Sequence, residues 1–403
     1  MPTYFWKEFQ ERHVSNAETS ATLSAIEERM RSFATTELAE PPCLQGDVDV
    51  FWREGWDRCG AAGIIGGPLP SEWGGSGRGL LSTIVTMETL GNCCADLGLL
   101  FSINAHLWAV AIPILTFGSD AQKKRWLPAL ADGRLIGGHG ATEPDAGSDI
   151  FSMTSTAVRD GDQWVLEGHK NFVANGPISD VFVVYATTAP ERGELGVTAF
   201  IVERDNPGLT IGEPLEKVGL QSSPSGTITM EDCRIPLDDI LGSEGGGAAC
   251  FNCSMEWERG SILAMHVGSM ERQLNEAIAH VRSRRQFNRA IGSFQSVANR
   301  IVDMKVRLDT ARPLVRRIGE LKDAGRGAML ESAVAKLHVS EAAVASGLDA
   351  MQIHGSRGYL SRNRIDVELR DALGARIYSG TNDLQKVMIA RLLGLPSSLV
   401  GGD

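Results

Sequence analysis

The feature that most constrains the fold of this sequence is its hydrophobic spacing, which changes twice along the chain. Up to about residue 132, apolar side chains recur every three or four residues, for example at Leu80, Ile84, Met87 and Leu90. From about residue 133 the period becomes two, and from about residue 246 the helical period returns. Helices followed by strands and then by helices predict an α+β protein, in which the two kinds of structure are segregated along the chain.

The three regions are expected to form separate domains. The first contains Leu99–Phe117, a nearly all-apolar stretch that we expect to be a buried core helix, because its length and flanks do not suit a membrane span. The second contains Asp160-Gly161 between two strand patterns, which is typical of a β-hairpin. We predict an N-terminal helical domain (1–132), a middle antiparallel β domain (133–245) and a C-terminal four-helix bundle (246–403).

The helices of the bundle are indicated by one-sided apolar patterns at about residues 263–281, 297–318, 327–351 and 383–393. Pro313 lies inside the second of these patterns. We expect it to kink or break that helix, because proline lacks a backbone donor and its ring clashes with the preceding turn.

Composition narrows the expected partners. The net charge of −11 argues against bulk binding to nucleic acid or to an anionic membrane. No run of 18 apolar residues occurs, and the first residues lack the basic and apolar segments of a secretion signal. The seven cysteines do not form two CxxC motifs, and the histidines have no metal-ligand spacing. We therefore expect a cytoplasmic protein with no metal site and no membrane or nucleic-acid partner.

Two short segments of the β region have the composition of ligand-binding loops. Ala141–Asp149 is rich in small residues, which let backbone N–H groups approach an anion such as a diphosphate; a tight turn is the alternative interpretation. Lys170–Gly176 follows a strand and contains Phe172, whose ring suits packing on a flat ligand; an ordinary strand end is the alternative.

Two charged segments lie in the second helical region. Glu258 precedes Ile262 and Met265 in one apolar stripe, near the expected start of a long helix. A catalytic carboxylate is one interpretation, and a first-turn charge favoured by the helix dipole is the other. Arg282–Phe287 ends that helix, either as a solvated basic end or as a phosphate clamp with Phe287 against an adenine.

These segments follow one another in an order that resembles the acyl-CoA dehydrogenase family over nearly the whole chain. The motifs that carry the resemblance are Thr142-Glu143-Pro144-x-Ala146-Gly147-Ser148-Asp149, Lys170-x-Phe172-x-x-Asn175-Gly176, Arg284-x-Gln286-Phe287, Gln352-Ile353-His354-Gly355, Arg370-Asp371 and Ile377-Tyr378-x-Gly380-Thr381. The resemblance implies tightly bound FAD, a homo-oligomer that is usually a tetramer, and α,β-dehydrogenation of an acyl thioester. The segments around His139–Pro144 and Ser254–Arg259 are similar to members of polyketide and nonribosomal-peptide pathways, several of which act on groups tethered to a carrier protein.

The resemblance also implies roles for individual residues. Those implied to lie at the flavin are His139, Ala141, Thr142, Gly147, Ser148, Phe172 and Ala174. At the position of Ala174 the family often has a residue with a hydroxyl, which bonds flavin N5. Those implied to reach the FAD of a neighbouring subunit are Arg284, Phe287, Gln295, Gln352, Gly355 and Ser356. Thr381 and Asp383 would hold the diphosphate and adenosine end, while Ser148 and Arg259 would contact the substrate.

One departure from the family pattern decides where the catalytic base should be. Many members carry a glutamate before the Gly-Thr of the last motif, and this chain has Ser379 there. A minority places the base on the first bundle helix immediately before an arginine, which matches Glu258-Arg259. The resemblance thus implies that Glu258 takes the α-proton while a β-hydride passes to flavin N5. The backbone N–H of Ser379 would bind the thioester carbonyl.

The expected substrate is an acyl-CoA or an acyl-carrier protein, and the expected electron acceptor is an electron-transfer flavoprotein or another oxidant. Two alternatives stay open on the sequence. A flavin monooxygenase of the same fold would use reduced flavin and oxygen and would need no base. A flavin-binding protein without turnover is the other, and the presence of Glu258 argues against it.

Overall fold

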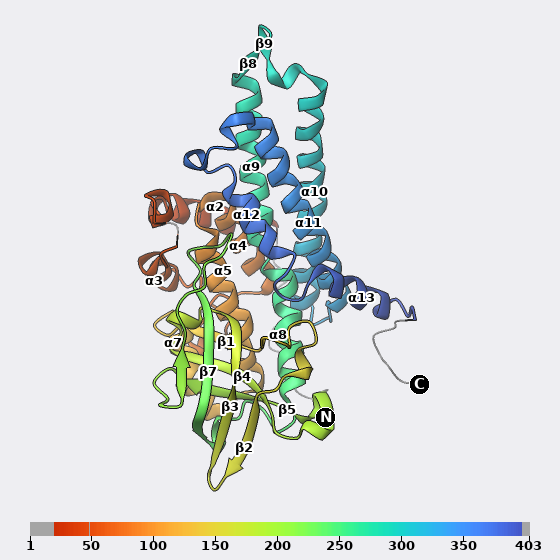
Figure 1. Cartoon of the computed structure of the whole chain (residues 1–403). Coiled ribbons are helices and arrows are strands. Elements are labelled where there is room, and N and C mark those ends of the chain that lie inside the picture. The colour runs from red at the N-terminus through yellow and green to blue at the C-terminus, as the bar shows by residue number, and fades with distance from the viewer. Residues whose placement is uncertain (1–19, 48, 397–403) are drawn as a thin grey trace.

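The computed structural model describes residues 20–47 and 49–396, so the outer ends of the expected terminal domains lie outside the described residues (Figure 1). The first helical region contains α2 (Ser20–Glu37), α3 (Arg53–Ala61), α4 (Leu80–Cys93), α5 (Leu97–His106), α6 (Ile112–Phe117) and α7 (Asp120–Ala131). The strands gather at one end of the molecule, and the long helices α9 (Ala264–Ser283), α10 (Gln295–Asp323) and α11 (Met329–His354) extend away from them.

The stretch Leu97–Phe117 is the core of the first region, as expected. It runs as α5, a π-helical segment Leu107–Ala111 and α6 without leaving the helical path. It is long and apolar enough to cross a membrane, with a mean hydropathy of 1.7, yet 94% of its most apolar window is buried inside the protein. His106 ends α5 fully buried: its Nδ1 accepts the N–H of Gly137 at 2.9 Å, and its Nε2–H donates to the carbonyl of Leu130 at 3.0 Å. The helix is thereby fastened to the first strand.

The middle region is one sheet of seven strands. They are β1 (Gly137–Gly140), β2 (Thr156–Asp160), β3 (Gln163–Ala174), β4 (Val181–Thr187), β5 (Val197–Glu203), β6 (Leu209–Ile211) and β7 (Ser225–Pro236). Their order is β1-β4-β2-β3-β7-β6, with β5 on β4. The expected hairpin at Asp160-Gly161 joins β2 to β3. Most neighbours are antiparallel, as expected, but β4 pairs in parallel with β1 and, through Thr156 and Thr187, with β2. The β2–β3 hairpin lies between β1 and β4 in the chain and provides the crossover that a parallel pair needs.

The second helical region contains α8 (Gly247–Ser261), the three long helices, and two shorter helices, α12 (Val367–Ala375) and α13 (Asn382–Leu392), which pack against α11. The short strands β8 (Arg285–Gln286) and β9 (Arg289–Ala290) form a hairpin at the tip between α9 and α10. The sequence patterns did not indicate α12. Pro313 does not break α10, which runs through it as one helix; Ala311 and Val315 beside it are buried, and this packing holds the helical path.

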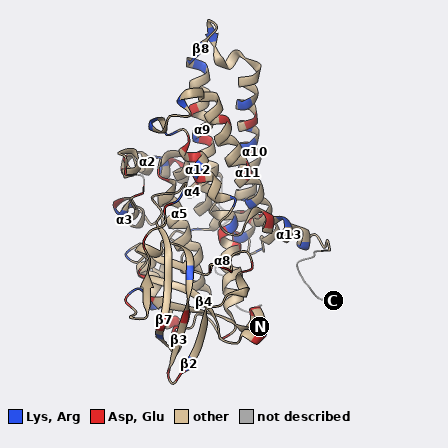
Figure 2. Ribbon diagram, viewed as in Figure 1, with Lys and Arg blue, Asp and Glu red and all other residues tan. Residues whose placement is uncertain are grey.

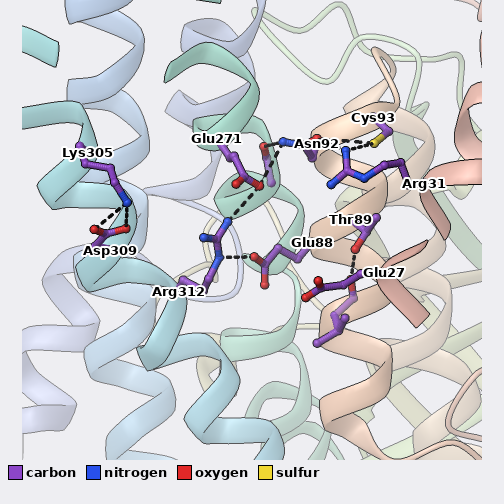
Figure 3. Close-up of polar contacts among 12 residues, drawn as sticks. Glu27, Arg31, Glu88, Thr89, Asn92, Cys93, Glu271, Lys305, Asp309 and Arg312 are labelled. Carbon is purple, nitrogen blue, oxygen red and sulfur yellow. Dashed lines mark hydrogen bonds and ion pairs between the residues drawn. The ribbon is translucent and has the colours of Figure 1, made fainter. Parts of the chain in front are cut away.

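A network of charges centred on one buried carboxylate joins the two helical regions (Figure 3). Glu88 on α4 is 5% exposed and accepts hydrogen bonds from Nε of Arg312 and, at 3.0 Å, from Nε of Arg316, both on α10. Arg312 also pairs with Glu271 on α9 at 3.0 Å, and Arg316 pairs with Glu27 on α2 at 2.8 Å. One carboxylate therefore orients two arginines that reach two further helices.

We predict that Glu88→Ala lowers the free energy of unfolding by roughly 3 kcal/mol, because two arginines lose a buried partner. Asp57→Ala is the control, since its ion pair with Arg53 has side chains 55% and 49% exposed and should contribute less than about 1 kcal/mol. Urea unfolding followed by tryptophan fluorescence measures both variants. Equal losses in the two variants would contradict a special role for the Glu88 network.

Candidate active site

Glu258 lies in the last turn of α8 and is 8% exposed. Its backbone carbonyl accepts the N–H of Ile262 at 3.1 Å, after which the chain turns through Ile262 and Leu263 into α9. The expectation that Glu258 stands near the start of a helix is therefore wrong. Glycine and serine are weak helix formers, so Gly260-Ser261 favours an end here, while the apolar pattern continues across the break and conceals it.

Two residues, Ser379 and Arg259, stabilise the negative charge of this carboxylate. The hydroxyl of Ser379 donates a hydrogen bond to Oε1 of Glu258. Nε of Arg259 donates to the backbone carbonyl of Ser379 at 3.2 Å, which ties the turn after α12 to the end of α8. The structure thus brings Glu258, Arg259 and Ser379 together, as the motifs implied.

The environment makes Glu258 a stronger base than an exposed glutamate. Burial raises its pKa to about 6, against the lowering effects of the Ser379 hydrogen bond and the positive charge of Arg259. Its place at the C-terminal end of α8 acts in the same direction as burial, because the helix dipole disfavours negative charge there. A carboxylate with this pKa is largely ionised near neutral pH and still binds a proton readily.

The turn that carries Ser379 is held in an unusual backbone conformation. Ser379 has φ 55° and Gly380 has φ 87°, and a Cβ added to Gly380 would lie 2.9 Å from Nε2 of Gln385. The buried Gln385 amide donates to the carbonyl of Gly380 at 3.0 Å. Thr381 begins α13 by accepting the N–H of Leu384 at 3.3 Å. Among the described residues, no acceptor bonds the N–H of Ser379, which leaves it available to a ligand.

Aromatic and sulfur contacts pack α8 against strands β1 and β4 of the sheet. The ring of Phe251 on α8 stacks on His139 of β1 at 6.1 Å between centroids, and the thiol of Cys250 lies 3.6 Å from the hydroxyl of Tyr185 on β4. Tyr185 in turn contacts Nε2 of His139 at 3.3 Å. Burial lowers the pKa of His139 to about 4, so the ring is neutral at physiological pH. His139 is thus a half-buried link between sheet and α8.

A buried ion pair shapes the loop after β1. Glu143 accepts hydrogen bonds from Nζ of Lys170 at 2.6 Å and from the N–H of Thr154 and of Ser155, at 2.6 and 3.0 Å. Burial opposes the charge, but these bonds and those from the hydroxyls of Thr154 and Ser155 hold the pKa of Glu143 at about 2. Both partners are almost fully buried, so the pair fixes both ends of the loop.

The same loop leaves its tip open. Ala141 is buried under it, Thr142 accepts the N–H of Asn171 at 2.8 Å, and Gly147 and Ser148 are exposed. A Cβ at Gly147 would meet nothing within 4 Å. Within the described part of the chain, no acceptor bonds the N–H groups of Gly147 and Ser148. A rigid loop with free N–H groups suits the diphosphate of FAD.

Phe172 stands where a flat ligand could cover it. The ring is 68% exposed, and the residue has φ 53° at an irregularity in the pairing of β3 with β7. Ala174 pairs with Ser225 two residues later and offers no hydroxyl. The neighbouring Asn171 bonds the carbonyl of Thr142, so the exposed ring stands on a strand that is joined to the loop after β1, and it offers a flat apolar surface to a planar ligand.

The residues implied to bind the FAD of a neighbouring subunit lie elsewhere. Arg284, Phe287 and Gln295 are exposed around the β8–β9 hairpin, about 30 Å along α9 from its start near Glu258, given 1.5 Å per residue. Phe287 is 86% exposed. Figure 2 shows the ribbon coloured blue, for Lys and Arg, at this hairpin. Gln352, Gly355 and Ser356 line an open hollow of about 450 Å³ at the end of α11.

Asp383 completes the set of expected residues. Its carboxylate is 91% exposed on the first turn of α13 and contacts Nζ of Lys386 at 3.4 Å. The expected residues therefore form one group beside Glu258 and the sheet and a second group at the far end of the bundle. A single chain does not bring the two groups together.

The structure adds contacts around Glu258 and Ser379 that the motifs did not indicate. Serine has no acidity that would mark it as a base, yet the hydroxyl of Ser379 bonds the carboxylate of Glu258. Tyr378 bonds Nε2 of His266 at 2.8 Å and packs on Phe101 at 5.0 Å between centroids, on the side of the Ser379 turn that faces α5 and α9. These pairs join residues more than a hundred positions apart, so no local pattern could have revealed them.

Comparison with known proteins agrees with this arrangement. Residues 20–134, 138–233 and 245–394 match the N-terminal, middle and C-terminal domains of acyl-CoA dehydrogenase, respectively. The L-prolyl-[peptidyl-carrier protein] dehydrogenase of Pseudomonas fluorescens is 46% identical over 346 residues, which cover 86% of this chain and 91% of that protein. The enzyme of the same name from Serratia sp. is 42% identical over 376 residues, covering 93% and 97%.

Solved structures give the same result. The prolyl acyl carrier protein oxidase AnaB superposes with a TM-score of 0.91 at 42% identity, covering 94% of this chain and all of that one. PigA with FAD and proline superposes with a TM-score of 0.91 at 41% identity, covering 94% and 99%. The curated relatives named here are dehydrogenases, which does not favour the monooxygenase alternative. The protein is an FAD-dependent enzyme that dehydrogenates an acyl thioester of CoA or a carrier protein, and the chain belongs to the acyl-CoA dehydrogenase family.

Proposed function

We propose that the substrate is an L-prolyl group held as a thioester on a carrier protein, and that Glu258 is the base. The substrate assignment is supported by the similarity to two L-prolyl-carrier dehydrogenases over most of both chains. The role of Glu258 is supported by its buried carboxylate, its pKa of about 6 and its contact with the Ser379 turn.

The proposed reaction removes a proton from the α-carbon of the prolyl thioester and a hydride from its β-carbon, which leaves a 2,3-dehydroprolyl thioester. Glu258 takes the α-proton. The N–H of Ser379 donates to the thioester carbonyl, where negative charge develops; one such donor contributes roughly 3 kcal/mol to transition-state stabilisation. FAD, when bound, supplies the acceptor for the hydride.

The other expected residues have supporting roles in this proposal. Thr142, Gly147, Ser148 and Phe172 hold FAD at the sheet, and Thr381 and Asp383 hold it at the start of α13. Arg259 fixes the Ser379 turn and contacts the substrate. Arg284, Phe287, Gln295, Gln352, Gly355 and Ser356 reach the FAD of a second subunit in a homo-oligomer, which we infer to be a tetramer. Electrons then leave to an electron-transfer flavoprotein or another acceptor.

The substrate proposal is tested by anaerobic titration of the FAD-loaded enzyme. We expect L-prolyl-carrier protein to bleach the flavin absorbance stoichiometrically. Free L-proline should leave the absorbance unchanged, because no thioester acidifies its α-carbon. Butyryl-CoA is the second control, since it carries a thioester but no amine. Bleaching by butyryl-CoA as fast as by the prolyl carrier would contradict the prolyl assignment and leave the family activity intact.

The base is tested by Glu258→Gln, which keeps the side-chain shape and removes the proton acceptor. We expect this variant to retain FAD and to lose about 10²–10⁴-fold in the rate of anaerobic flavin reduction. Glu256→Gln is the matched control on the same helix, because Glu256 bonds Lys322 rather than the Ser379 turn. Wild-type reduction in Glu258→Gln would remove Glu258 from this role.

The pH dependence follows from the ionisation of Glu258. The base must be ionised, so the rate of flavin reduction should fall as pH decreases through about 6 and should level off above it. Stopped-flow absorbance between pH 5 and 8 measures this profile. Burial also raises the pKa of Asp371 to about 7, so this residue titrates in the same pH range. FAD retention is recorded at each pH to distinguish a structural change caused by Asp371 from the ionisation of Glu258. A flat profile with full FAD retention would contradict the assignment.

A further inference from the structure

The contacts of Glu258 are unequally divided between its two carboxylate oxygens. Oε1 accepts the hydroxyl of Ser379. Oε2 accepts no hydrogen bond from any described residue. It is also not sealed inside the protein, because it is absent from the set of unbonded side-chain atoms that are fully buried. One oxygen of the carboxylate is therefore held by the protein, while the other is open.

The hydroxyl that holds Oε1 is itself rigidly placed. The carbonyl of Ser379 is bound by Arg259 at 3.2 Å, and the next residue, Gly380, is bound by the buried amide of Gln385 at 3.0 Å. The N–H of Asn382 donates to the carbonyl of Arg376 at 3.0 Å and closes the turn. Bonds from α8 and α13 therefore fix the backbone on both sides of the hydroxyl. The position that many family members use for the base carries a fixed donor here.

We propose that Ser379 is a positioning residue for catalysis: its hydroxyl holds Oε1 of Glu258 and presents Oε2 to the α-carbon of the substrate. This inference rests on the proposed role of Glu258 as the base. The hydroxyl has two physical effects. It restricts the carboxylate to one orientation, and it stabilises the ionised form that accepts the proton.

The charged and titratable groups around Glu258 come from several elements. Arg259 shares α8 with it, Tyr378 precedes Ser379 in the turn, and Tyr185 faces it from β4. Burial raises the pKa of both tyrosines well above the ordinary value, so they stay protonated throughout the working range. Removal of the Ser379 hydroxyl therefore leaves Arg259 as the remaining group that favours the carboxylate anion.

Two substitutions separate the hydroxyl from the backbone. Ser379→Ala removes the hydroxyl and keeps Cβ, whereas Ser379→Gly also relieves the positive φ of 55°. We expect both variants to bind FAD and to slow flavin reduction at pH 6 by roughly tenfold, with the midpoint of the pH profile moved up by about one unit. Ser379→Thr restores a hydroxyl and should return the midpoint toward that of the wild type, although a β-branched residue is strained at this φ.

A measurement without substrate keeps this test separate from the substrate proposal. Infrared difference spectra of the FAD-loaded enzyme between pH 4 and 8 report the protonated carboxyl of Glu258, which is identified by its absence in Glu258→Gln. We expect its midpoint to rise in Ser379→Ala and Ser379→Gly alike, whether or not the prolyl carrier proves to be the substrate.

The outcomes divide clearly. A raised midpoint in both variants, with recovery in Ser379→Thr, supports the positioning role. An unchanged infrared midpoint and pH profile in both variants would overturn it, even if the rate fell, because a loss of rate alone fits a general disturbance of the turn. A raised midpoint in Ser379→Ala that is absent in Ser379→Gly would also overturn it, since the effect would then come from backbone strain.

Discussion

The exclusion of Leu97–Phe117 from water is the constraint on which the rest of the molecule depends. A helical run with so few polar side chains must be covered on all sides, and parts of all three regions provide that cover. His106 fastens it to β1, and Trp108 stacks on Trp257 of α8 with centroids 6.0 Å apart. Trp257 directly precedes Glu258 in the sequence, so the packing that buries the apolar helix also brings the candidate base to the sheet.

The buried charges of this protein fall into two kinds. Glu143 and Lys170 form a pair in which the carboxylate has five hydrogen bonds, and Glu88 is likewise satisfied by two arginines. Such groups fix loops and helices. Glu258 is buried with one hydroxyl and a neighbouring guanidinium, and one of its oxygens is unbonded within the described chain. Incomplete satisfaction of a buried carboxylate is costly for stability and useful for proton transfer.

Much of the fold could be predicted from local patterns, and much of the site from the order of motifs. The change of hydrophobic period located the helical and strand regions, because burial on one face imposes a period that each element repeats. The break between α8 and α9 was hidden because Ile262 and Met265 continue the apolar stripe across it. Pro313 was expected to disturb α10, but packing on both sides outweighs a missing donor. The parallel pairing of β1 depends on a distant strand, β4, and leaves no trace in the four residues of β1 itself.

The bond between Ser379 and Glu258 illustrates the limit of reading a site from sequence. The two residues are 121 positions apart, and serine lacks the acidity that would mark it as a functional group. Only the meeting of a turn with the end of a helix brings its hydroxyl to the carboxylate of Glu258.

The ion pair beneath the loop after β1 has a consequence for how the enzyme responds to acid. The pKa of Glu143 is lowered from 4.5 to about 2, so its contribution to folding is complete above about pH 5 and is lost progressively as the pH falls through 4.5 toward 2. Glu258, with a pKa of about 6, gains its proton long before that point. With Glu258 in its proposed role as the base, mild acidification should therefore stop the chemistry while the loop after β1 keeps its shape, and a return to neutral pH should restore turnover without refolding.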